Sequence, residues 1–201
     1  MEILFNYILE NILEFFGVTF SFIYVILSIR QNIFCWPALI IAAIMNIIVY
    51  HSIGLSLQMT MQFFFIVTAI YGWRNWKIQK KVNKIETIKV KKWGLNKNIK
   101  WISIGLLITA IFTILLKLIP YKSLMYSNYP FLDSLMFVFN IIPMYMTGKK
   151  ILECWIYFIC IDIISGVFYF STEEFFYCLL FFGYIPFAIT GFITWKQRLA
   201  K

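Results

Sequence analysis

Charged residues are scarce in this chain. Only 13% of its 201 residues are charged, whereas 62% are hydrophobic. A soluble domain of this length has too little interior to bury so much apolar surface, and a lipid bilayer is the solvent that such a composition fits. We therefore predict an all-α integral membrane protein.

The residues that carry common catalytic chemistry are also few. The sequence holds one histidine and four cysteines, and no two cysteines are spaced as metal ligands. It has no glycine-rich phosphate loop and no nucleophile elbow. We expect no metal, no cofactor and no coupling to ATP. The first residues lack the basic segment of a secretory signal, so we also expect no cleaved leader.

Apolar stretches near the length of a bilayer span recur seven times. They lie at 14–29, 36–52, 57–73, 101–119, 131–147, 154–170 and 175–195. A lysine-rich segment separates the third from the fourth. We expect one membrane domain made of a first three-helix repeat, a basic cytoplasmic loop, a linker helix and a second three-helix repeat. Their predicted ranges are 14–76, 77–100, 101–119 and 131–198.

The basic residues define an orientation. If the basic loop is cytoplasmic, seven spans place the N-terminus outside, the C-terminus inside and sixteen of the 18 Lys and Arg residues on the inner side. Positive residues favour the cytoplasmic side in this way. The net charge of +9 is thus explained by membrane topology, and we expect the bilayer rather than nucleic acid as the partner.

Part of the sequence repeats itself. Trp36 and Trp76 recur 119 residues later as Trp155 and Trp195, and Gly72 recurs as Gly191. An offset of four helices preserves direction across the membrane, so the repeat predicts a parallel 3+1+3 plan. Carriers often place their substrate site between such repeats. Because these tryptophans fall near span ends, we expect them to be anchors at the membrane interface.

Polar side chains lie at mid-membrane depth in five of the predicted spans. Asp162 is at the centre of the sixth span, where a carboxylate costs about 2.5–3.5 kcal/mol and so must face a bundle interior or a cavity. Uncharged groups occur at similar depth in other spans, and Trp73 shares a helical face with one of them. These candidates are Asn46, Gln62, Trp73, Asn140 and Tyr184. We predict a substrate site there; the alternative is interhelical hydrogen bonding with no ligand.

Several motifs resemble the Pnu family of bacterial vitamin transporters. They are Gln62-Phe-Phe-Phe65, Tyr71-Gly-Trp-x-x-Trp76, Phe131-Leu-Asp-Ser134 and Glu153-x-Trp155. The resemblance implies a homotrimer of seven-helix protomers in the bacterial cytoplasmic membrane. It also implies facilitated diffusion of an unphosphorylated B vitamin, which a cytoplasmic vitamin kinase then traps. Gln62 and Trp73 match positions that face the substrate in the family.

The chain departs from the nicotinamide riboside members of that family. Where those have asparagines, it has Ala42, Ala69 and Asp162. The lost hydrogen-bonding groups suit a ribosyl amide, so our expectation places thiamine slightly ahead of nicotinamide riboside. A carboxylate favours a cationic ring, which both of these vitamins have, and the neutral riboflavin comes behind both. Two other classes stay open: a membrane-embedded enzyme, and a non-transporting receptor that uses the cavity around Asp162.

Overall fold

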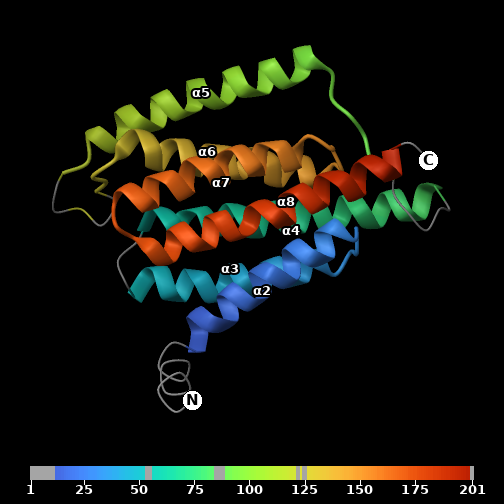
Figure 1. Cartoon of the computed structure of the whole chain (residues 1–201), viewed down its shortest axis with the longest axis horizontal. Helices are drawn as coiled ribbons and strands as arrows, with labels where there is room; N and C mark the ends of the chain where they lie inside the picture. Colours follow the sequence, from blue (N-terminus) through green and yellow to red (C-terminus); the bar gives the residue numbers. More distant parts are fainter. Residues whose placement is uncertain (1–11, 53–55, 84–88, 121–122, 124–125, 200–201) are drawn as a thin grey trace.

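Helices make up almost all of the structure. The computed structural model describes residues 12–52, 56–83, 89–120, 123 and 126–199, and within them the chain forms seven α-helices that lie side by side (Figure 1). This confirms the predicted all-α class. The helices are α2 Ile12–Ile29, α3 Cys35–Ser52, α4 Ser56–Asn83, α5 Leu95–Lys117, α6 Pro130–Gly148, α7 Cys154–Ser171 and α8 Phe175–Leu199.

Six of these helices are long and apolar enough to cross a membrane: all except α4. Helix α4 is less apolar because it carries two glutamines near its start and several basic residues near its end. The predicted basic loop at 77–100 was wrong at both ends, since α4 continues to Asn83 and α5 already begins at Leu95. Lys, Arg and Gln are good helix formers, so a helix continues past the end of its apolar run. Residues 84–88 of that loop lie outside the described residues.

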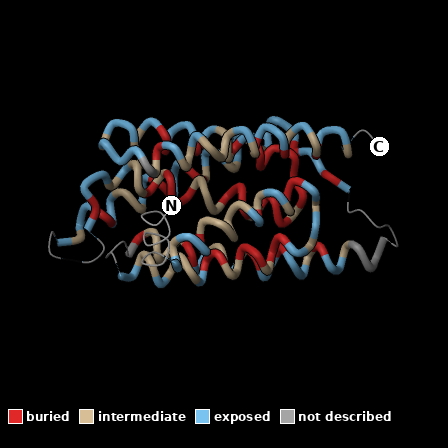
Figure 2. Tube along the Cα trace, turned by 60° about the horizontal axis from the view of Figure 1, so that its bottom comes forward, coloured by how far each residue is buried: buried red, intermediate tan, exposed pale blue. Residues whose placement is uncertain are grey.

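The helices pack in a defined order. Consecutive helices α2, α3 and α4 contact one another in turn, as do α6, α7 and α8. Two further contacts join these groups, α4 with α6 and α8 with α2. Helix α5 packs mainly against α6 and lies at one edge of the molecule (Figure 1). Figure 2 shows that the buried residues gather on the inward sides of the bundle.

A close contact between a glycine and an indole occurs twice. A methyl group at Gly72 would overlap the ring of Trp36, and one at Gly191 would lie 2.6 Å from the ring of Trp155. Both glycines let a neighbouring helix approach to the distance of a bare backbone. The two contacts are separated by the same 119 residues as the sequence motifs.

The connections after α2 and α6 are also alike. Gln31 and Lys150 both have positive φ, at 59° and 54°. The amide of each donates to a carbonyl three residues earlier, Gln31 to Ser28 at 2.9 Å and Lys150 to Thr147 at 3.0 Å. These two left-handed residues bridge the two turns, because the Nζ of Lys150 donates to the Oε1 of Gln31 at 2.8 Å.

Four tryptophans form a buried layer next to these turns. Trp36 meets Trp76 edge to face at 5.1 Å, and Trp155 meets Trp195 in the same way at 5.4 Å. We call this group the tryptophan layer; its members are at most 3% exposed. The prediction that they anchor the membrane interface was wrong. The four indoles pack closely where the helices meet, and two of their N–H groups donate hydrogen bonds to backbone carbonyls inside the protein.

Those two N–H groups join the helix groups. Trp76, in α4, donates to the carbonyl of Thr147 in α6 at 3.3 Å. Trp195, in α8, donates to the carbonyl of Ser28 in α2 at 3.2 Å. Each indole is a second donor to a carbonyl of the last helical turn, which also accepts the amide of Gln31 or of Lys150. The tryptophan layer therefore holds the two groups together at the end of the bundle where α2 and α6 finish.

Candidate functional site

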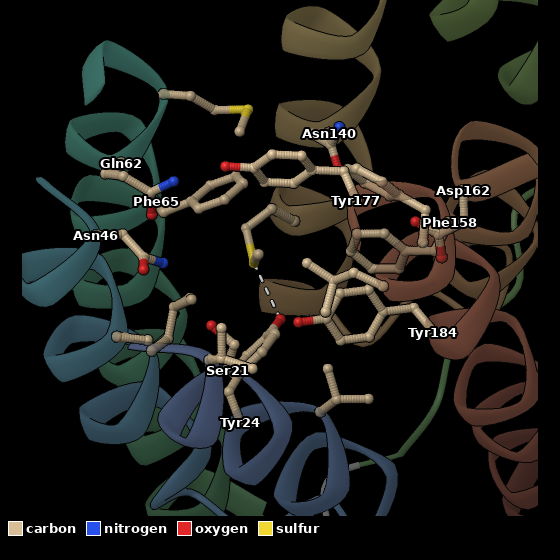
Figure 3. Close-up of a pocket in the computed structure, with 18 of the residues that line it drawn as sticks. Ser21, Tyr24, Asn46, Gln62, Phe65, Asn140, Phe158, Asp162, Tyr177 and Tyr184 are labelled. Carbon is tan, nitrogen blue, oxygen red and sulfur yellow. Dashed lines mark hydrogen bonds between the residues drawn. The ribbon is translucent and has the colours of Figure 1, made fainter. Parts of the chain in front are cut away.

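A central cavity of about 210 Å³ lies between all the described helices except α5. Its walls are mostly apolar and aromatic, with a few polar groups that converge, as is usual for small-molecule sites. Five of the six predicted site residues line it: Asn46, Gln62, Asn140, Asp162 and Tyr184. Figure 3 shows Asn46 and Gln62 on one side of the cavity and Asp162 and Tyr184 on the other.

Asp162 is the more deeply buried of the two acidic residues that line the central cavity. It lies on α7 and is only 6% exposed. Among the described residues, no hydrogen-bond donor or cation is close enough to pair with its carboxylate. A buried carboxylate without a partner is costly unless something else pairs with it. Its position suits a ligand that brings a positive charge or a donor.

Two side-chain amides face Asp162 from the other side. Gln62 on α4 is 4% exposed, and Asn46 on α3 is half-buried. Within the described part of the chain neither amide makes a hydrogen bond. Gly17 on α2 leaves room for the Asn46 side chain, since a methyl group there would overlap the Asn46 Oδ1. Each amide offers both donors and an acceptor to a ligand.

The other two predicted residues define the remaining walls. The side-chain N–H of Asn140 donates to the Met136 carbonyl at 2.7 Å, so the side-chain oxygen of Asn140 is left to accept a hydrogen bond from another group. Tyr184 packs its ring against Phe22, 5.1 Å between centroids. Sequence reasoning missed Tyr24, whose hydroxyl donates to the Met144 sulfur at 3.0 Å beside the cavity (Figure 3). A lone tyrosine in an apolar run gives no distinguishing signal.

Trp73 does not belong to this site. Its side chain is 40% exposed and is not among the residues that line the central cavity. It follows Gln62 by three helical turns, which places it about 16 Å further along α4. The buried face of α4 passes instead through Gly72 and Trp76 at that level. The helical face that Trp73 shares with Gln62 therefore did not predict its location correctly, because the two side chains lie at different depths along α4.

An adjoining cavity of about 220 Å³ shares a wall with the central cavity. The shared wall consists of Tyr50, Met61, Asn140, Tyr177, Leu180 and Phe181. The other polar residues that line the adjoining cavity are Gln58, Asp133, Tyr169 and Glu174. The sequence did not predict that Tyr169 and Asp133 line one cavity. Their common location depends on the packing of three helices, which no local pattern encodes.

The charge of the two cavities is opposite to that of the chain. Glu14 and Asp162 line the central cavity, and Asp133 and Glu174 line the adjoining one. These are four of the nine acidic residues, whereas none of the described lining residues is one of the 18 lysines and arginines. Carboxylates in low-dielectric surroundings attract cations and repel anions.

The central cavity ends at the tryptophan layer. Trp155 belongs to both, and the other three indoles lie behind it, buried. Lys150 is 1% exposed and lies over the ring of Trp76, with 4.3 Å between its Nζ and the ring centroid. The cavity is thus closed on the side where the helix groups are joined by hydrogen bonds.

Six helices surround a cavity lined by polar side chains, some of which have no hydrogen-bond partner among the described residues. This arrangement defines the chain as a helical membrane protein with a small-molecule cavity between its helices. It belongs to the family described as nicotinamide mononucleotide transporter, whose model matches residues 11–197. This confirms the resemblance to the Pnu family.

Individual proteins agree with that membership. The chain is 30% identical over 139 residues to the nicotinamide riboside transporter PnuC of Escherichia coli (strain K12) and to that of Shigella flexneri. The match covers 60% of this chain and 58% of either relative, less than two thirds of their length. A crystal structure of the vitamin B3 transporter PnuC superposes with a TM-score of 0.79, over 99% of this chain and 86% of that one. At 15% identity the superposition shows a shared fold.

Family membership confirms the predicted location, a multi-pass protein of the bacterial cytoplasmic membrane. The relatives are named as transporters, in agreement with the prediction that the chain is not an enzyme. Among the described residues, no group of three His, Cys, Asp or Glu side chains is placed to hold a metal ion.

Proposed function

We propose that this protein carries an unphosphorylated, positively charged B vitamin across the membrane by facilitated diffusion. Nicotinamide riboside is the first candidate, because two relatives bear its name. Thiamine is the second, because Asp162, Ala42 and Ala69 stand where nicotinamide riboside members have asparagines and Asp162 lines the cavity. Both vitamins contain a cationic ring.

The observation that carries this proposal is the unpaired carboxylate of Asp162 in a cavity without basic residues. A cationic ring would pair with the carboxylate, and aromatic faces such as that of Tyr184 would add to the attraction. The amides of Asn46 and Gln62 would bind hydroxyl or amide edges of the vitamin, and Asn140 would contribute its free oxygen.

The same cavity argues against a phosphorylated ligand. Phosphate groups are bound in proteins by Arg, by Lys or by clusters of backbone N–H groups. A nicotinamide mononucleotide would bring its phosphate among Asp162, Glu14 and the aromatic wall, and no described lining residue is basic. We therefore infer that the vitamin enters without its phosphate and that a cytoplasmic kinase adds it afterwards, trapping the product.

The proposed architecture is a parallel 3+1+3 plan, with α2–α4 and α6–α8 as equivalent units and α5 as the linker. Its support is the recurrence of the glycine–indole contact and of the left-handed turn at one offset. The N-terminus would be outside and the tryptophan layer cytoplasmic, on the side of the basic residues. Movement of the two units would open the layer and close the opposite end. The homotrimer implied by the resemblance completes the proposal.

Uptake into proteoliposomes tests this function directly. Purified protein is reconstituted, and the entry of labelled nicotinamide riboside, thiamine and nicotinamide mononucleotide is followed without an ion gradient. We expect saturable entry of one cationic vitamin up to equal concentrations inside and outside, and no entry of the mononucleotide. Accumulation above equilibrium would contradict facilitated diffusion. Entry of the mononucleotide at a comparable rate would contradict the assignment of the substrate class.

A further inference from the structure

The adjoining cavity has the features of a binding site in its own right. Its volume of about 220 Å³ is similar to that of the central cavity, and the two are separated only by side chains that line both. It is formed by the ends of α3 and α7 and by the first turns of α4, α6 and α8. All of these ends lie opposite the tryptophan layer. The adjoining cavity therefore lies beside the central cavity at the end of the bundle away from that layer.

Two carboxylates from different helix ends meet in this cavity. Asp133 is in the first turn of α6, and one of its oxygens accepts a hydrogen bond from the Ser127 hydroxyl. Glu174 immediately precedes α8 and is exposed. No described residue of the lining is basic, so neither carboxylate is neutralised by a cation within the cavity.

Aromatic rings form a continuous wall beside these carboxylates. Tyr169 is stacked on Phe181 with 5.4 Å between centroids and 7° between planes, and Tyr177 lies 5.2 Å from Tyr169. Two of these three side chains, Tyr177 and Phe181, also face the central cavity. A cluster of aromatic rings with carboxylates beside it is complementary to a cationic ring, which is attracted both by the aromatic rings and by the negative charges.

We propose that the adjoining cavity is a second, weaker subsite that binds the cationic ring of the vitamin before it moves to Asp162. The inference rests on the proposed function and extends it. Tyr177 and Phe181 of the shared wall contact Tyr169 of the adjoining cavity, so aromatic side chains line the way from one cavity to the other. The ligand class is a cationic heteroaromatic ring without phosphate, since two carboxylates repel an anion.

Uptake kinetics of a charge variant test the subsite. In Glu174→Gln the half-saturating concentration of the transported cationic vitamin should rise about two- to fivefold at low ionic strength, the range expected for a partly exposed charge pair. The maximal rate should stay the same, because Asp162 is intact. The double variant Asp133→Asn with Glu174→Gln should raise the half-saturating concentration further. Its asparagine side-chain oxygen still offers an acceptor to the Ser127 hydroxyl.

The matched control is Glu173→Gln. Glu173 is exposed, adjacent in sequence and absent from the lining of both cavities, so this variant changes the net charge equally without touching the subsite. Equal effects of the two glutamine variants would mean general electrostatic steering and would overturn the subsite. So would an equal effect of Glu174→Gln on the reduced, uncharged form of nicotinamide riboside. If the unmodified protein moves no cationic vitamin at all, the proposed function fails; if it does and the two variants behave alike, only the subsite fails.

Discussion

Replacing Asp162 by asparagine removes one charge from the central cavity and almost nothing else. Two unit charges about 5 Å apart attract by about 3 kcal/mol at an effective dielectric constant of about 20. Desolvation of the carboxylate and of the ring offsets part of this, so a net loss of about 1.4–2.8 kcal/mol is expected. The dissociation constant of a cationic vitamin should therefore rise about 10- to 100-fold. Isothermal titration of the purified variant in detergent measures it.

The uncharged, reduced form of nicotinamide riboside is the matched ligand for this experiment. It keeps the shape of the ring and the ribose, so its affinity should change little between the original protein and Asp162→Asn. Glu173→Gln, on the surface, should leave both affinities unchanged. An Asp162→Asn protein that folds and binds the cation with undiminished affinity would refute the reasoning. An equal loss for the charged and the uncharged ligand would also refute it, because charge would then not be the cause.

Three further predictions concern other residues of the bundle. Gln62→Leu keeps the volume and removes an unpaired amide, so vitamin affinity should fall about two- to tenfold in the same titration, the value of one hydrogen bond. Trp73→Ala should leave affinity unchanged, since the side chain is exposed and outside the cavity; a clear loss would return it to the site. Gly72→Ala and Gly191→Ala should each lower stability by about 1–3 kcal/mol through overlap with a buried indole, seen as a lower midpoint of thermal unfolding. Gly183→Ala, where a methyl group meets no atom within 4 Å, should not lower it.

The helices were predictable from the sequence because lipid imposes a simple rule. Backbone groups in a bilayer must pair internally, so each long apolar run becomes a helix. The rule fails where the run ends in water. At Trp76 the apolar pattern stops, yet the backbone of α4 continues to Asn83 because its lysines and glutamine favour helix. The start of α5 at Leu95 was missed for the same reason, with Lys97 and Lys100 in its first turns.

The sequence predicted those residues of the candidate site that are costly to bury in a membrane. A carboxylate at mid-membrane must face an interior, and Asp162 does. The same argument identified Gln62 and Asn46, which are polar at equal depth. It could not identify Tyr24 or Glu14, since tyrosine is common near membrane surfaces and Glu14 is close to a helix end. The tryptophans were misassigned because indoles near span ends are equally typical of interfaces, and only packing distinguishes the two cases.

The sequence repeat contributes paired positions to the lining of the central cavity, and the two members of a pair are not the same residue. Positions 119 residues apart face the central cavity in pairs: Ser21 with Asn140, Leu39 with Phe158, Gln62 with Phe181, and Phe65 with Tyr184. The members of two of these pairs differ in polarity, Gln62 from Phe181 and Phe65 from Tyr184. Asp162 has Ala43 as its counterpart, which is buried and outside the lining. In the proposed site, the carboxylate of Asp162 on one side and the amides of Gln62 and Asn46 on the other would favour one orientation of a ligand with one cationic ring and one hydroxyl-rich end. A symmetric cavity would not impose that order. The tryptophan layer differs from the cavity in this respect, because both members of each of its pairs are tryptophan.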